Sequence, residues 1–188
     1  MKLIKKDFFI IHSKFKSHLK YKKDLLDIFD QYPENKNNYA NDHIYKLDFD
    51  NSSNKNRKWT QLIANDLLSH FKNCANKIGY KDVLLNNLWF QQYNKNSRHN
   101  WHIHGGNYSG VYYVDFKEED VKTKLVDCTD QSIYSLDIKE GDIILFPAFV
   151  IHESGVQLNN NLKTIISFNI DFNEIKKEVL DKLNASNR

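Results

Sequence analysis

Residues 142–147 of this chain read Asp-Ile-Ile-Leu-Phe-Pro, a short apolar run that is rich in β-branched residues and ends at a proline. Runs of this length and composition are typical of buried strands. Similar short runs, either apolar or alternating, follow one another along the chain after Gly79. They predict strands at 83–93, 109–116, 123–126, 133–138, 142–146 and 164–172.

The chain before Gly79 shows helical spacing of its apolar residues instead. We expect a first strand at 3–12, a helix at 17–31 and a longer helix at about 59–78, which the glycine terminates. A last amphipathic helix is expected at about 173–183. The helix at 17–31 is expected to place on or near its buried face Leu19, Leu25, Leu26, Ile28 and Phe29.

Helices that precede a run of strands predict an α+β protein in which the helices brace one face of an antiparallel jelly roll. With 188 residues, a mass of 22.3 kDa and no Gly/Ser/Pro-rich linker, the chain is expected to form one domain over residues 1–188. Its expected parts are a helical region at about 1–79, a cupin-like jelly-roll core at about 80–172 and a C-terminal helix at about 173–184.

Composition excludes several classes of function. The 27 Lys and Arg residues against 24 Asp and Glu leave a net charge of +3, too small and too evenly spread for a nucleic-acid footprint. The longest apolar runs fall short of the roughly 20 residues of a membrane helix. Cys74 and Cys128 show neither zinc spacing nor a CxxC pair, which is typical of thiols in a reducing compartment. We therefore expect a cytoplasmic protein without a membrane partner.

Three of the eight histidines have a spacing that favours a metal site. His102 and His104 are two positions apart, so at the end of a strand both imidazoles would lie on one side of the sheet. His152 follows the apolar strand at 142–147 and would add a third ligand from a neighbouring strand. Such a facial set leaves positions on the metal open. His99 is interpreted either as a partner that lines this pocket or as an ordinary loop histidine.

A cation begins the strand that follows His152. Period-two alternation places Lys163 on the same face as Ile165, Ser167 and Asn169. If this face is inward, the buried charge needs an anion, and a dicarboxylate that also chelates the metal would supply one. If it is outward, the lysine simply points to water. Within 109–114, either Tyr112 or Tyr113 should face inward, and the Tyr113 hydroxyl is suited to bind the same carboxylate.

These motifs occur together in one order along the chain. They are His102-Ile103-His104, then 109–114 (Ser-Gly-Val-Tyr-Tyr-Val), then 141–147 (Gly-Asp-Ile-Ile-Leu-Phe-Pro) leading to His152, then Lys163 before 166–169 (Ile-Ser-Phe-Asn). Over about 88–172 the chain resembles the iron(II)/2-oxoglutarate-dependent dioxygenase superfamily. It is most similar to the small prolyl-hydroxylase-like members found in phages and marine bacteria. The resemblance implies a double-stranded β-helix, which is a form of jelly roll, with iron bound between its strands.

The resemblance also implies roles for individual residues. His102 and His152 would be iron ligands, and His104 would be the third ligand where most relatives have Asp or Glu. Lys163 stands where relatives usually have an arginine that binds the far carboxylate of 2-oxoglutarate. Tyr113 would assist that contact, and Tyr93 is a further candidate for the cosubstrate pocket. Fe(II), 2-oxoglutarate and O₂ would together hydroxylate a C–H bond and release succinate and CO₂.

The sequence does not determine the substrate or the oligomeric state. The resemblance favours a peptidyl, prolyl-like residue or a small molecule over nucleic acid, and it leaves a homodimer open. If the gene is carried by a phage, the protein would act in the host cytoplasm. Two other interpretations stay open: a non-catalytic, cupin-like metal-binding or virion assembly module, and a three-histidine oxygenase that does not use 2-oxoglutarate.

Overall fold

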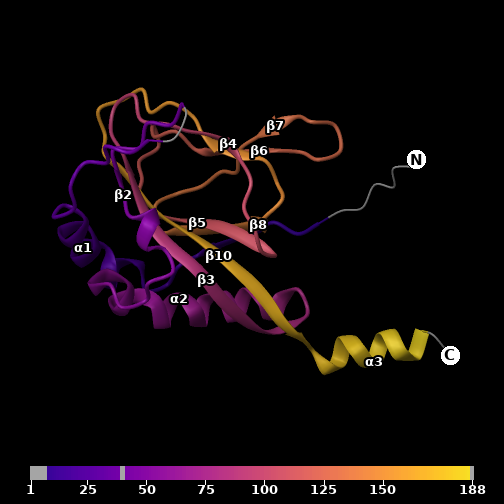
Figure 1. Cartoon of the computed structure of the whole chain (residues 1–188). Helices are drawn as coiled ribbons and strands as arrows, with labels where there is room; N and C mark the ends of the chain where they lie inside the picture. The colour runs from indigo at the N-terminus through magenta and orange to yellow at the C-terminus, as the bar shows by residue number, and fades with distance from the viewer. Residues whose placement is uncertain (1–7, 39–40, 187–188) are drawn as a thin grey trace.

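Two antiparallel sheets form the centre of the computed structural model, which describes residues 8–38 and 41–186 (Figure 1). The larger sheet has the strand order β1-β8-β5-β10-β3-β2, and the smaller one has the order β4-β9-β6-β7. The larger sheet consists of β1 (Ile11–Lys14), β2 (Lys46–Leu47), β3 (Tyr80–Tyr93), β5 (Tyr108–Asp115), β8 (Asp142–Pro147) and β10 (Lys163–Ile175). The smaller sheet consists of β4 (His99–His102), β6 (Thr123–Val126), β7 (Ile133–Tyr134) and β9 (His152–Ser154).

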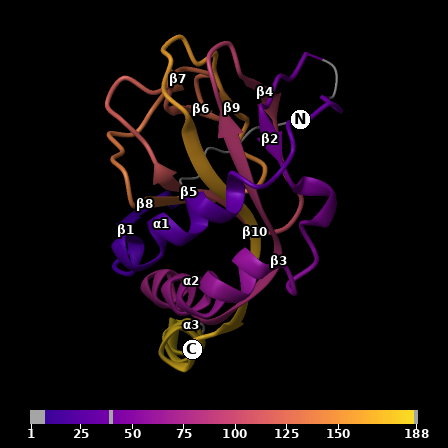
Figure 2. The ribbon, with the colours of Figure 1, turned by 90° about the vertical axis from the view of Figure 1, so that its left-hand side faces the viewer.

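Two helices, α1 (His18–Phe29) and α2 (Lys58–Lys77), cover one face of the larger sheet (Figure 2). On α2 a fully buried stripe recurs at helical spacing and includes Ile63, Leu67 and Phe71. The Phe71 ring lies 4.3 Å from that of Phe168 on β10, measured between centroids. A 3₁₀ turn, η1 (Phe49–Asn51), precedes α2. No helix within 8–38 and 41–186 is long and apolar enough to cross a membrane.

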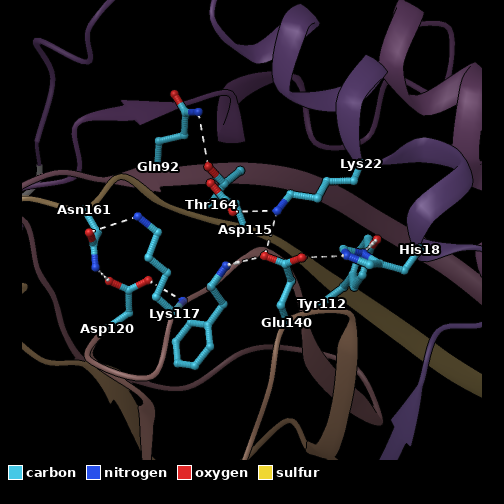
Figure 3. Close-up of polar contacts among 11 residues, drawn as sticks. His18, Lys22, Gln92, Tyr112, Asp115, Lys117, Asp120, Glu140, Asn161 and Thr164 are labelled. Atoms are coloured by element: carbon cyan, nitrogen blue, oxygen red, sulfur yellow. Dashed lines mark hydrogen bonds and ion pairs between the residues drawn. The ribbon is translucent and has the colours of Figure 1, made fainter.

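Polar contacts also join α1 to the larger sheet (Figure 3). The His18 ring Nδ1 lies 2.7 Å from the Tyr112 hydroxyl of β5. The Lys22 ammonium donates to the carboxylates of Asp115 and Glu140 at 2.8 and 2.7 Å. These bonds satisfy polar groups at the border of the core, so the helix is held in one orientation on the sheet.

The strands of the larger sheet are buried on both faces. The helices cover one face, and a second core lies between the two sheets on the other. Tyr112 packs in the helix-side core, whereas Tyr113 packs in the core between the sheets. On β10, Ile166 and Phe168 belong to the helix side and Ile165 to the inner side. The alternation predicted from the sequence is therefore confirmed, and Tyr113 is the inward tyrosine of its pair.

The predicted α+β class is correct, but several boundaries are not. The first strand is β1 at Ile11–Lys14, and residues 3–7 of the expected strand lie outside the described residues. The strand expected at 133–138 ends at Tyr134. The C-terminal helix, α3 (Lys177–Ser186), begins four residues later than expected because β10 continues to Ile175 in register with Tyr80.

Leu19 was expected on the buried face of the first helix, yet its side chain is 85% exposed. His18 takes that place in the buried stripe of α1, since its ring bonds the Tyr112 hydroxyl and lies near the Glu140 carboxylate. Leu25 and Phe29 are buried as predicted. Three short strands, β2, β4 and β9, were not expected as separate elements.

We expect Gly110→Ala to lower the free energy of unfolding by about 1–3 kcal/mol, the usual cost of overpacking a dense core. A Cβ at this position on β5 would overlap the carbonyl oxygen of Ile144 and lie 2.5 Å from the Phe168 ring. Urea unfolding measures the change. Gly105→Ala is the matched control, because a Cβ there meets nothing within 4 Å, and an equal loss in both variants would contradict the packing argument.

Candidate metal centre

Three histidines converge at the edge where β4 and β9 pair. His102 is the last residue of β4 and lies directly opposite His152, the first residue of β9. His104 follows on a loop that is fixed by a hydrogen bond from its backbone N–H to the Ala148 carbonyl, at 2.9 Å. One ring nitrogen from each of the three lies within 4.8 Å of the other two. The structure thus brings together the three histidines that the sequence predicted as metal ligands.

Backbone carbonyls set the orientation of two of these rings. The His102 Nδ1 lies 2.6 Å from the Asn100 carbonyl, and the His152 Nδ1 lies 2.9 Å from the Val150 carbonyl. A carbonyl only accepts hydrogen bonds, so each Nδ1 carries the proton and donates. The Nε2 lone pair of each ring is left available to a metal, as in most histidine-ligated sites.

Burial keeps the imidazoles neutral at physiological pH. Desolvation, followed by repulsion from the neighbouring rings, lowers the pKa of His104 and of His152 to about 3, and burial also lowers the pKa of His102. Neutral imidazole is the form that binds a metal. Ligand nitrogens about 2.1 Å from one ion lie at most about 4.2 Å apart, so a small ring rotation brings all three into range. The donor set therefore fits a metal ion.

His99 belongs to the same cluster of rings. Of the two interpretations of His99, this favours the one in which it lines the pocket over the one in which it is an ordinary loop histidine. Its ring stacks on that of His102 with centroids 3.8 Å apart, and its Nε2 lies 3.6 Å from the Asp42 carboxylate. The Gln91 amide nitrogen is 3.3 Å from its Nδ1. His99 therefore stacks against His102, one of the three candidate metal ligands. The four remaining histidines are outside the three-residue group: His12, His18, His43 and His70.

Lys163 is completely buried, which rules out the outward orientation. Its ammonium donates to the Val121 carbonyl at 2.9 Å and to the Ser154 hydroxyl at 2.7 Å, and it lies 4.4 Å from the centre of the Tyr93 ring. No carboxylate of the described chain forms an ion pair with it. Desolvation lowers the pKa of Lys163 to about 7, although the Asp120 carboxylate opposes the shift. A buried amine whose partners are all neutral is a site for an anion.

Tyr93 and Ser154 contact this amine, and two further side chains, Tyr113 and Thr123, are linked to them. Tyr113 donates to the Thr123 hydroxyl at 2.7 Å, and Tyr93 interacts with the Ser154 hydroxyl. Thr123 on β6 and Ser154 on β9 are direct cross-strand neighbours. Burial raises the pKa of both tyrosines, so both remain hydrogen-bond donors.

The Val121 carbonyl that binds Lys163 is held by a network of loop contacts. The Gln157 side chain accepts from the Val121 N–H at 3.0 Å and donates to the Asp120 carboxylate at 2.6 Å. Asn161 donates to the same carboxylate at 3.2 Å and accepts from Lys117 at 3.1 Å (Figure 3). These bonds connect the loop after β5 to the segment before β10.

The space among these groups is small. A cavity of about 20 Å³ is bounded by the three histidines together with Tyr93, Thr123 and Ser154, and it has room for about one water molecule. Neither Lys163 nor Tyr113 lines it. A dicarboxylate could reach the Lys163 ammonium only if the Thr123 and Ser154 side chains turned away from their present partners.

Thr123 and Ser154 were missed as site residues. The signal for Ser154 was present in the sequence, since period-two alternation from His152 places both side chains on one face. Trp89 and Gln91 also line the cavity.

We expect the metal-free protein to lose stability as the pH falls from about 6.5 toward 3. His99, His104 and His152 have pKa values near 3 when folded and near 6.5 when unfolded, so in this window the unfolded chain binds more protons. Each group contributes up to about 1.4 kcal/mol per pH unit. Urea unfolding at several pH values measures the slope.

His99→Gln should reduce that slope, because it removes one buried imidazole. His43→Gln is the control, since His43 is exposed. If both variants kept the full slope, protonation of this cluster would not be its cause.

Solved structures with the same fold provide the comparison. An oxidoreductase of the 2OG-Fe(II) oxygenase family from Burkholderia pseudomallei is 12% identical, with a TM-score of 0.66 over 89% of this chain and 87% of that chain. The viral collagen prolyl hydroxylase vCPH from Paramecium Bursaria Chlorella virus-1 is 12% identical, with a TM-score of 0.55 over 87% and 96%. A prolyl hydroxylase from Trichoplax adhaerens, solved with a peptide fragment of hypoxia inducible factor, is 12% identical, with a TM-score of 0.59 over 85% and 81%.

In sequence, no protein-family model matches the chain, and no curated protein matches it either. The fold is therefore recognised from structure. The arrangement of its two antiparallel sheets is that of the solved structures above. The chain has the double-stranded β-helix fold of the 2OG-Fe(II) oxygenases.

Proposed function

We propose that the protein is an Fe(II)- and 2-oxoglutarate-dependent oxygenase that hydroxylates a peptidyl, prolyl-like residue or a small molecule. One observation carries the proposal: the buried lysine amine, which has no anionic partner in the described chain, bonds Ser154 on β9, the strand whose first residue is one of the three clustered, neutral histidines. A metal fits the histidines and a carboxylate fits the lysine amine. A ligand that is both a chelator and an anion would satisfy the two together.

In this proposal His102, His104 and His152 hold the iron. The carbonyls of Asn100 and Val150 keep two of the rings turned so that Nε2 faces the ion. His104 is fixed through its backbone. None of these three ligands is a carboxylate, so the iron centre would keep a charge of +2 until an anion binds. A dianionic cosubstrate should therefore bind before the substrate.

Lys163 pairs with the far carboxylate of 2-oxoglutarate, while Tyr113 and Tyr93 donate hydrogen bonds to it. Thr123 and Ser154, which now occupy these donors, turn aside when the cosubstrate enters. The buried walls around Lys163 exclude water, which strengthens the ion pair.

When bound, iron supplies the oxygen activation that the side chains lack. The balanced reaction consumes O₂ and 2-oxoglutarate, converts a substrate C–H to C–OH, and yields succinate and CO₂. A peptidyl substrate is supported by the likeness to the prolyl hydroxylase that was solved with a peptide.

The first test is an anaerobic titration of the Fe(II)-loaded protein with 2-oxoglutarate, followed by the visible charge-transfer band of the chelate. We expect a band in the wild type, and Lys163→Met should need at least tenfold more 2-oxoglutarate because it keeps the bulk and loses the charge. Lys46→Met is the matched control: Lys46 is also buried, but its ammonium contacts the Phe29 and Asp30 carbonyls of α1.

His104→Ala should weaken iron binding, which is measured by metal content after dialysis. An absent band with iron demonstrably bound would reject 2-oxoglutarate as cosubstrate. It would favour a three-histidine oxygenase without that cosubstrate, an interpretation that the small cavity of about 20 Å³ also supports.

Cosubstrate affinity should also depend on pH through Lys163. Because burial lowers its pKa to about 7, the amine of the free protein loses its charge as the pH rises above 7, and affinity should fall by up to about tenfold per unit. Lys163→Arg stays charged throughout this range and should bind equally at pH 6.5 and 8.5. If both proteins lost affinity in parallel, a group other than Lys163 would be responsible.

A further inference from the structure

A larger cleft opens from the histidine cluster on the side away from Lys163. Its volume is about 290 Å³, and His99, His102 and His104 form one end of it. The other walls come from β3 and from the segment around β2 and η1. The cleft is in direct contact with the candidate metal ligands, so a molecule bound in it would place part of its length beside them.

The charged side chains that line this cleft are negative. Asp42 and Asp50 line it, and no lysine or arginine does so within 8–38 and 41–186. The remaining polar lining consists of amide side chains and the histidines. The protein as a whole carries a net charge of +3, so this acidic lining is a local feature and not a consequence of composition.

An aromatic path connects the histidine cluster to Asp50. The Trp89 ring lies 5.6 Å from the His104 ring, and the Phe49 ring lies 5.1 Å from Trp89, edge to face. Asp50 follows Phe49 directly on η1. The face of an exposed aromatic ring attracts cations, and Phe49 is 45% exposed, whereas Trp89 is buried.

The two carboxylates are not equally available. Asp42 accepts two hydrogen bonds from Asn100, at 2.8 and 3.0 Å, and lies 3.6 Å from His99. The Asp50 side chain makes no hydrogen bond or ion pair with any residue in the described part of the chain. Asp50 therefore retains its full capacity to bind an incoming donor.

Apolar side chains also line the cleft. Ile44, Leu47 and Ile103 line the cleft together with the two aromatic rings. This lining suits an aliphatic stem, and a stem of methylene groups exposes C–H bonds along its length. Of the two cleft carboxylates, Asp50 is the one without a partner in the described chain, so it is the group that would select a cation.

From these observations we infer that the substrate carries an ammonium or guanidinium group on an aliphatic chain, as a lysyl- or arginyl-type side chain does. The cation pairs with Asp50 and lies against the exposed Phe49 ring, Asp42 adds to the negative potential, and a methylene of the chain lies beside the histidine cluster. The inference names the substrate class of the proposed function and rests on that function only for the oxidation step. That step turns one methylene C–H into C–OH with the O₂ and 2-oxoglutarate stoichiometry given above.

The test compares ligands whose side chains differ in charge. N-acetyl-lysine methylamide, its uncharged norleucine analogue, and the corresponding glutamate and proline compounds are titrated calorimetrically into the protein alone and into the anaerobic protein loaded with Fe(II) and 2-oxoglutarate. Succinate release is then measured in air with each ligand. Binding to the protein alone does not depend on the proposed oxygenase activity.

We expect the lysine compound to bind about three- to tenfold more tightly than the norleucine compound, as an exposed ion pair with a cation–π contact allows. Asp50→Asn should remove most of this preference, and Asp50→Lys should reverse it in favour of glutamate. Asp24→Asn, which changes an exposed aspartate of α1 on the helical side, is the matched control and should leave the preference unchanged.

Equal binding of the lysine and norleucine compounds would overturn the inference. So would tightest binding of the proline compound, or a lysine preference that survives in the Asp50→Asn, Asp42→Asn double variant. A lysine preference without succinate release would support the inferred ligand class and reject the oxygenase. Succinate release together with preferred binding of a neutral ligand would reject the inferred ligand class and support the oxygenase.

Discussion

Burial of both faces of the six-stranded sheet is the constraint on which the rest of the structure depends. Every residue of β10 from Lys163 to Ile170 is buried, because α2 packs on one face and the smaller sheet covers the other. A polar group on the inner face is therefore shielded from water, and leaving it without a partner in the protein or in a ligand costs free energy, as at the Asn169 side-chain oxygen, which has no hydrogen-bond partner in the described chain. Gln91 and Ser167 satisfy each other at 2.9 Å. The Lys163 amine has only neutral partners, which is why an anion is expected beside it.

The same constraint explains which parts of the site could be predicted from the sequence. A strand buried on both sides cannot slip by one residue without exchanging its two faces. Alternation therefore correctly placed Tyr112 and Tyr113 on opposite faces, and the structure shows that Tyr113 and Ile165 are the inner ones. β4 and β9 are short and rich in polar residues, and their pairing joins segments some fifty positions apart, so local pattern gave no signal for them. The end of β10 was misjudged because its last residues are exposed, although pairing with β3 holds them in the sheet.

The residues that line the cleft could not be predicted from the sequence, for a different reason. They come from an Asn-rich region without periodicity, whose position is set by contacts distant in sequence. Asp42 is placed by the Asn100 amide, and the neighbouring His43 pairs through its backbone with Arg98. Loops of this kind are fixed by the scaffold that they contact, and they are also where binding residues concentrate. The residues that would select a substrate are thus the least predictable, while those that would hold a metal lie at or next to strand ends and are the most predictable.

Binding of an anion at Lys163 would exchange hydrogen bonds without adding to their number. The Lys163 ammonium already donates to Ser154 and to the Val121 carbonyl, and Tyr113 already donates to Thr123. A carboxylate that replaces the two hydroxyls leaves each donor with a partner, so the count of bonds is unchanged. What changes is their character, because bonds to an ionised acceptor are roughly twice as strong as those between neutral groups. The affinity of such a site would therefore come from the charge of Lys163, and the two hydroxyls would serve to keep the amine satisfied while no ligand is bound.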